Sequence, residues 1–137
     1  MSTGLPAKIN LEIVTPDSLL FSGEVDEVVV PGKEGALGIL PGHAPLISEL
    51  KIGVLSYRIG YSKTRLSCGW GFVEVLPDQV AVLAEIAEQP EDIDVERARK
   101  DKAHALELLR SKDPNTDYEA ALELLQRAVT RLEVAAS

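Results

Sequence analysis

The segment Glu24–Ile47 reads EVDEVVVPGKEGALGILPGHAPLI, and it decides what kind of fold the first part of the chain adopts. It begins with a β-branched run that ends at Pro31-Gly32, and it continues with glycine- and proline-rich turns between short apolar stretches. Runs of this kind, separated by such turns, are typical of short strands. The segment Gly35–Ile47 is either an active-site loop or a surface shaped to touch another protein.

The same pattern extends on both sides of this segment, from Ile9 to about Ala87. KINLEIV and GVLSYRIG alternate apolar and polar residues, as strands with one wet face do. RLSCGWGFVEVLP and QVAVLAEIA follow, joined by Pro77-Asp78. This spacing predicts about six to ten short strands in an all-β sandwich or barrel.

Near Glu88 the composition changes. The segment EQPEDIDVERARKDKAHALELLRSK has no glycine and is rich in Ala, Leu, Glu, Lys and Arg, which is typical of a helix. We expect Asp94 to cap this helix, and we expect the helix to end before Pro114, which cannot continue it.

A second helix is predicted to begin at the capping box formed by Thr116 and Glu119. Its apolar residues recur at steps of three and four and form a stripe made of Tyr118, Ala121, Leu122, Leu125, Ala128, Val129 and Leu132. Isolated helices of this length are marginal in water, so the stripe must dock on the first helix, on the sandwich or on a partner. We therefore expect two domains, an all-β sandwich (residues 1–88) followed by a C-terminal α-helical hairpin (residues 89–137).

The formal net charge of −8 argues against nucleic acid or an anionic membrane surface as the main partner. The single cysteine cannot form an internal disulfide. No apolar run approaches the roughly 20 residues that span a bilayer, and the N-terminal MSTGLPAKINLEI has no signal-peptide core. We expect the protein to reach a membrane only through another molecule.

Catalytic and metal sites are not predicted. His43, His104 and Cys68 lack the spacing of metal ligands, and GKEG lacks the remainder of a phosphate-binding loop. Three carboxylates that could be imagined as a catalytic set are better explained as solvated side chains: Asp26, Glu27 and Glu34.

Two arginines of the second helix, Arg127 and Arg131, are four residues apart and therefore share one face. One explanation is a solvated face on which Glu123 offsets Arg127. The other is that both guanidinium groups converge on a phosphate, which suits their forked geometry.

The chain carries the segment FSGEVDEVVVPGKEGALGILPGHAPLI, followed by a helical half that opens with IDVERA. In this order of motifs it resembles the epsilon subunit of bacterial and chloroplast F-type ATP synthases. The resemblance extends from about Ile9 to Ala135. It implies a non-catalytic rotor subunit of a proton- or sodium-translocating complex, whose sandwich grips the gamma subunit and rests on the c-subunit ring. It also implies a hairpin that can extend to the alpha and beta subunits and inhibit ATP hydrolysis.

The resemblance implies a location and a set of contacts. The protein would associate with a membrane only through the complex, at the cytoplasmic face of the bacterial inner membrane or the stromal face of the thylakoid. Some relatives carry an acidic residue where this chain has Ala36. The implied rotor interface consists of Gly32, Lys33, Glu34, Leu40, Pro41, Gly42, His43, Ala44, Pro45 and Leu46.

In some relatives the folded hairpin binds ATP through an I/L-D-x-x-R-A motif and arginines of the second helix, and His104 stands where those relatives have another basic residue. The matching residues here are Glu88, Ile93, Asp94, Arg97, Ala98, Arg127 and Arg131. No cofactor is required, and ATP would be a regulatory ligand. The alternative function is a nucleotide-sensing module whose main role is this binding, and an unrecognised hydrolase is disfavoured because no catalytic set is found.

Overall fold

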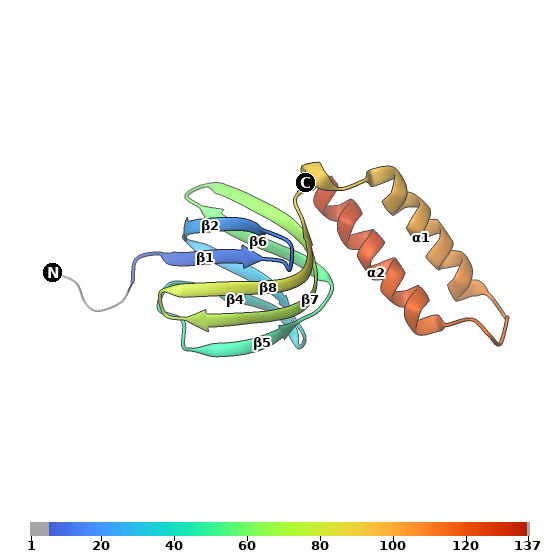
Figure 1. Ribbon diagram of the computed structural model, residues 1–137, viewed down its shortest axis with the longest axis horizontal. Helices are drawn as coiled ribbons and strands as arrows, with labels where there is room; N and C mark the ends of the chain where they lie inside the picture. The colour runs from blue at the N-terminus through green and yellow to red at the C-terminus, as the bar shows by residue number, and fades with distance from the viewer. Residues whose placement is uncertain (1–5, 137) are drawn as a thin grey trace.

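The computed structural model describes residues 6–136, so residues 1–5 and 137 of the two expected domains lie outside the described residues. Eight strands form a sheet that folds over into a sandwich, and two antiparallel helices form a hairpin beside one end of it (Figure 1). The expected all-β sandwich followed by a C-terminal helical hairpin is confirmed.

The strands of the sheet are β1 (Ile9–Val14), β2 (Leu19–Val25), β3 (Glu27–Gly32), β4 (Gly35–Ile39), β5 (Leu46–Leu50), β6 (Gly53–Ile59), β7 (Ser62–Leu76) and β8 (Gln79–Glu88). Their order is β2-β1-β8-β7-β5-β3-β4, and β6 pairs with both β3 and β7. All neighbours are antiparallel except β1 and β8, which are parallel. The core lies between the two layers.

Strand β1 illustrates how the sequence pattern builds this core. Ile9, Leu11 and Ile13 are buried, while the residues between them face solvent. Because side chains of a strand alternate between its two faces, one apolar row enters the core and one polar row remains wet. The other strands contribute mainly valine and leucine to the same core.

Strand β7 bends in the middle and so belongs to both layers. Its first part pairs with β6, up to Cys68, and its last part pairs with β5, from Gly71 onward. At the bend Trp70 has φ 53° and Gly71 has φ 149°. A Cβ at Gly71 would lie 2.0 Å from the backbone oxygen of Leu83 on β8, so only glycine fits there.

The helical half begins with a short 3₁₀ turn, η1 (Pro90–Asp92), and continues with α1 (Val95–Arg110) and α2 (Tyr118–Ala135). The prediction that Asp94 caps the first helix is confirmed, since its side chain accepts a hydrogen bond from the backbone N–H of Arg97 at 3.1 Å. The predicted cap of the second helix is wrong by one residue. Asp117 caps α2, because its carboxylate accepts from the N–H of Ala120 at 3.0 Å, whereas the Thr116 hydroxyl donates to Ser111.

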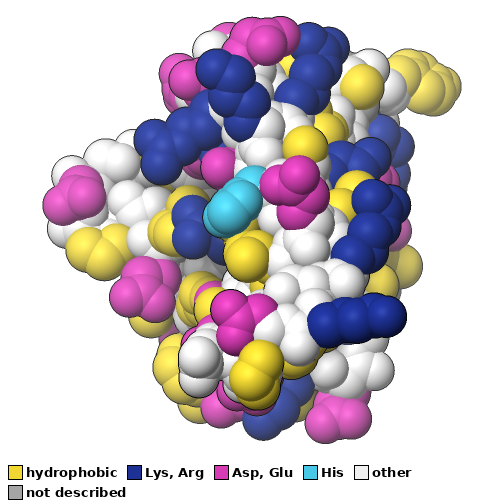
Figure 2. All heavy atoms as spheres, turned by 90° about the vertical axis from the view of Figure 1, so that its right-hand side faces the viewer, with side chains coloured by type: hydrophobic (Ala, Val, Ile, Leu, Met, Phe, Trp, Pro, Cys, Tyr) yellow, Lys and Arg dark blue, Asp and Glu magenta, His cyan; other side chains and the backbone are white. Residues whose placement is uncertain are grey.

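The two helices pack mainly on each other, and α2 also contacts β6, β7 and η1. Ala121 and Ala128 of the predicted stripe are buried, but Tyr118, Leu122 and Val129 are exposed. On the side of the molecule that carries the hairpin, hydrophobic side chains are interspersed with charged side chains of both signs (Figure 2). No helix within residues 6–136 has the length and apolar character needed to cross a membrane.

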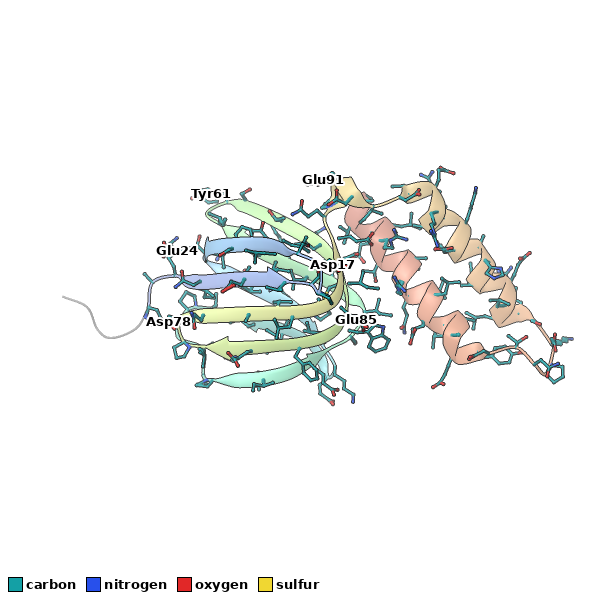
Figure 3. The ribbon with its side chains drawn as sticks, viewed as in Figure 1. Asp17, Glu24, Tyr61, Asp78, Glu85 and Glu91 are labelled. Carbon is teal, nitrogen blue, oxygen red and sulfur yellow. The ribbon has the colours of Figure 1, made fainter. Side chains whose placement is uncertain are left out.

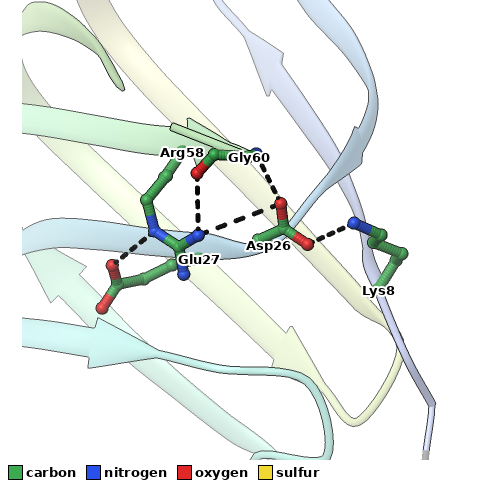
Figure 4. Close-up of polar contacts among 5 residues, drawn as sticks. All are labelled: Lys8, Asp26, Glu27, Arg58 and Gly60. Carbon is green, nitrogen blue, oxygen red and sulfur yellow. Dashed lines mark hydrogen bonds and ion pairs between the residues drawn. The ribbon is translucent and has the colours of Figure 1, made fainter. Parts of the chain in front are cut away.

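A polar network ties the N-terminal end of β1 to the β6–β7 turn (Figure 4). Asp26 forms an ion pair with Lys8, accepts a hydrogen bond from the N–H of Gly60 at 2.7 Å, and lies 4.0 Å from Arg58. Arg58 also donates to the backbone oxygen of Gly60 and to Glu27. The expectation that these carboxylates are simply solvated is therefore wrong for Asp26, whose side chain is 19% exposed, and Glu27 is partly exposed and paired with Arg58.

Candidate functional site

The loop between β4 and β5 holds one fixed shape. The N–H of Gly42, whose φ is 86°, donates to the backbone oxygen of Pro77 at 2.7 Å, and the N–H of His43 donates to Leu40 at 3.2 Å. Leu40 is 55% exposed and Leu46 is 38% exposed. The loop therefore presents apolar side chains on a backbone that is already ordered, which favours contact with another molecule over catalysis.

The turn between β3 and β4 is the second segment that the resemblance implies for the rotor interface. Lys33 donates its backbone N–H to Glu49 and forms a 3.0 Å ion pair with the Glu49 carboxylate, while Glu34 is exposed. The hydrogen bond from Lys33 to Glu49 raises the pKa of the lysine. Gly32 is buried, and a Cβ there would lie 2.8 Å from the backbone oxygen of Gly35, so a larger residue would force a shift.

These two segments lie at opposite ends of β4, not side by side. The loop is tied to Pro77, next to Asp78, which Figure 3 places at the end of the sandwich away from the hairpin. The turn follows Gly32, which pairs with Leu50, and Leu50 pairs with Gly71. Gly71 in turn pairs with Ala84, next to Glu85, so the turn lies at the hairpin end of the sandwich (Figure 3). A strand rises about 3.3 Å per residue, so the five-residue β4 separates the segments by roughly 15 Å. A single interface through both would have to run along β4, which has a free edge.

An exposed apolar patch on the outer face of the sandwich was missed by the sequence reasoning. We call Ile47, Phe72 and Leu83 the outer-face patch; they are 69%, 51% and 53% exposed. Phe72 pairs directly with Leu83 across β7 and β8, and Glu49 and Glu74 border the patch through their pairing with Phe72 and Ile47. The signal was the nearly unbroken apolar run VAVLA in β8, because a strand that is apolar on both faces has a second face to cover.

The residues of the expected nucleotide site meet at the junction between the sandwich and the hairpin. A cavity of about 400 Å³ is lined by Ile86, Glu88, Asp94, Arg97, Asp101, Leu124, Arg127, Ala128 and Arg131. Ile93 and Ala98 are buried and do not line it, and His104 is exposed on α1 away from it. The structure thus brings together five of the seven expected residues, Glu88, Asp94, Arg97, Arg127 and Arg131.

The charges around this cavity are unevenly engaged. Arg131 grips Glu88 with two hydrogen bonds, from Nε at 2.8 Å and from Nη2 at 3.1 Å. Arg127 makes no hydrogen bond or ion pair among the described residues, so its expected pairing with Glu123 is not found. The two arginines do not form a solvated face either, because Arg131 is engaged by Glu88. Arg127 is the guanidinium group that remains available to an anion.

The remaining reactive groups do not form a catalytic set in the described part of the chain. Residues 6–136 contain no cluster of three or more His, Cys, Asp or Glu side chains able to hold a metal ion. Burial raises the pKa of the Cys68 thiol to about 12, so this cysteine is a thiol and not a nucleophilic thiolate at neutral pH. The arrangement is suited to binding other molecules.

Two family models cover nearly the whole chain. The model for the β-sandwich domain of the ATP synthase delta/epsilon chain matches residues 8–90, and the model for the long α-helix domain of the same chain matches residues 91–136. An ATP synthase epsilon chain from Syntrophobacter fumaroxidans is 47% identical over 128 residues, which is 93% of this chain and 96% of the relative. One from Koribacter versatilis is 52% identical over 103 residues, 75% of this chain and 72% of the relative.

The fold is also found in a solved structure of the mitochondrial ATP synthase of Euglena gracilis that contains OSCP, F1 and the c ring. The match has a TM-score of 0.84 at 24% identity and covers 100% of this chain and 86% of the other. Both family models and the bacterial relatives agree with the resemblance carried by the Phe21–Ile47 segment and by IDVERA. The chain therefore belongs to the epsilon chain family of F-type ATP synthases, and it is an accessory subunit of that complex rather than its catalyst.

Proposed function

We propose that the chain is a central-stalk rotor subunit whose sandwich binds the gamma subunit and rests on the c-subunit ring. The outer-face patch is the observation that carries this proposal. Its three apolar side chains are each at least half exposed, they lie together on the sheet, and carboxylates border them. An exposed apolar patch with a polar rim is typical of a protein interface. The complementary surface should be apolar with a basic rim, and gamma is the partner to which we assign it.

The ordered β4–β5 loop supports a second contact at the far end of the sandwich. Its backbone is fixed by the bonds to Pro77 and Leu40, so little conformational entropy is lost when it binds. We assign the c ring to this end, with Leu40, His43 and Leu46 as contacts. In this arrangement the protein associates with the membrane only through the complex, at the cytoplasmic face of a bacterial membrane or the stromal face of a thylakoid.

The hairpin is the regulatory part of the proposal. It leaves the sandwich and inhibits ATP hydrolysis by contacting the alpha and beta subunits. The exposed side chains of Tyr118, Leu122 and Val129 support this role, because they provide an apolar face that the docked hairpin leaves uncovered.

The test is ATP hydrolysis by the cognate catalytic complex from which this subunit has been removed. The full-length chain and a chain ending at Glu88 are added back in turn, and binding to gamma is measured for both. We expect both chains to bind and only the full-length chain to inhibit. Inhibition by both chains would move the brake out of the hairpin, and failure of both to bind gamma would refute the rotor assignment.

A regulatory ATP site is a second candidate function, favoured by the unengaged Arg127 at the cavity of about 400 Å³. Three arginines and three carboxylates line this cavity, so the formal charge of the site is balanced and Arg127 must supply most of the attraction for phosphate. Calorimetric titration with ATP should show binding that Arg127→Gln abolishes and that Arg99→Gln, on the exposed side of α1, leaves intact. Equal loss in both variants, or no binding by the unmodified chain, would reject the site.

A further inference from the structure

The junction between the sandwich and the hairpin contains a compact group of polar contacts. Glu88 is the last residue of β8, and Ser67 lies opposite it on β7. The Ser67 hydroxyl donates to Glu88 Oε1 at 3.2 Å, and Arg131 of α2 donates to both carboxylate oxygens. The side chains of Arg131 and Glu88 are only 16% and 23% exposed, so water screens this pair weakly.

This contact differs from the other ion pairs of the described residues because it joins the two parts of the protein. Within the described residues 6–136, Arg131–Glu88 is the one ion pair that joins the hairpin to the sandwich. Around it α2 contributes Arg127 and the buried Thr130, which face Ile52, Gly69 and Ile86 of the sandwich. Apolar side chains such as Ile52 and Ile86 also line the junction, and the forked ion pair adds a directional, weakly screened contribution to the docking free energy.

We propose that Ser67, Glu88 and Arg131 form a latch that holds the hairpin on the sandwich without any bound ligand. Glu88 supplies the anionic partner for the Arg131 fork, so the docked hairpin is the resting state of the free subunit. The regulatory meaning of the latch rests on the proposed function, in which the undocked hairpin is the inhibitory state. The docking itself can be tested in the isolated chain.

Thr130 offers a probe of docking, since it lies on the face of α2 that the sandwich covers and is 8% exposed. The substitution Thr130→Cys introduces a thiol that a maleimide reagent reaches only when the hairpin leaves. The native Cys68 lines the same junction, so it is replaced by alanine in every chain. A separate chain with Val82→Cys is the control, because Val82 lies in the sandwich core and a thiol there reacts only when the sandwich itself opens. Mass spectrometry of the labelled peptide in each of the two chains separates undocking from unfolding.

In nucleotide-free buffer the Thr130→Cys chain should label at least about tenfold more slowly than the same chain in denaturant. Glu88→Gln in this background should accelerate labelling at position 130 by about tenfold, since a charge-assisted contact of this kind is lost. Arg99→Gln, which breaks the exposed contact between Arg99 and Glu96, is the matched control and should leave the rate unchanged. The exchanged pair Glu88→Arg with Arg131→Glu should return the rate toward that of the parent.

Several results would overturn the latch. One is labelling at position 130 that is as fast in the nucleotide-free parent as in denaturant. Others are an unchanged rate in Glu88→Gln, equal acceleration in Arg99→Gln, or parallel acceleration at the Val82→Cys control, which would indicate general loosening of the sandwich. None of these rates depends on ATP hydrolysis, so failure of the latch and failure of the proposed brake are separate outcomes.

Discussion

Replacing Phe72 by alanine should weaken the complex with gamma by about 30-fold. Phe72 is 51% exposed in the free chain, and a whole aromatic side chain offers roughly 200 Å², so about 100 Å² would be covered on binding. At about 25 cal/mol per Å² this area is worth about 2.5 kcal/mol, of which the remaining methyl group retains a part. A loss of about 2 kcal/mol corresponds to about a 30-fold rise in Kd.

The assay is calorimetric or optical measurement of Kd for purified gamma. Ile59→Ala is the matched control, because Ile59 is an apolar strand residue of similar exposure, 46%, and lies outside the outer-face patch. Both side chains are half exposed, so both variants should fold and melt like the parent. The reasoning is refuted if Phe72→Ala binds gamma as tightly as the parent, or if Ile59→Ala weakens binding to the same degree.

Three further predictions concern the fold. Gly71→Ala should lower the free energy of unfolding by more than about 3 kcal/mol in chemical denaturation, because its Cβ would lie 2.0 Å from a carbonyl oxygen and its φ is 149°; a loss below about 1 kcal/mol would contradict this. The pKa of Asp26 is lowered, first by the hydrogen bond from Lys8 and then by that from a backbone N–H, so its contribution to stability is present above the unfolded pKa of 3.8 and lost as pH falls through the folded pKa. Asp26→Asn should therefore reduce the fall in Tm between neutral and acid pH, and an unchanged fall would exclude this group. Asp117→Ala should destabilise the chain by about 1 kcal/mol, and Thr116→Ala by clearly less, as measured by thermal unfolding.

Local patterns predicted most of the fold. The alternation in KINLEIV placed Ile9, Leu11 and Ile13 in the core, and the Asp94 cap marked the start of α1. The start of α2 was predicted one residue too early, because Thr116 and Asp117 are both residue types that cap helices well. The Thr116 hydroxyl donates its hydrogen bond to the Ser111 hydroxyl, which leaves Asp117 to cap the helix. The bend of β7 was not predicted, since GWG signals an irregularity without saying which way the strand turns.

The candidate sites were harder to predict because they depend on residues that are distant in the chain. The arginines of α2 were identified, but the partner of Arg131 is Glu88, which is 43 residues away on another element. Spacing within the helix made Glu123 a candidate partner for Arg127, but Arg127 lines the cavity and pairs with no described residue. The outer-face patch likewise requires the register of β7 against β8, which pairs Phe72 with Leu83.

The way in which the hairpin is built favours a movable element over a fixed one. Its two helices pack on each other through small buried residues, Ala98 and Ala105 on α1 and Ala121 and Ala128 on α2, so their mutual interface survives when the pair leaves the sandwich. Undocking then loses chiefly the contacts of α2 with β6, β7 and η1, together with the Arg131–Glu88 pair. The apolar face of Tyr118, Leu122 and Val129 is exposed even in the docked state, so a partner that covers it adds binding free energy without first displacing the sandwich. Such a partner shifts the hairpin only to the extent that it binds the undocked form more tightly. The strength of the latch therefore sets how strongly any partner must bind before the hairpin moves.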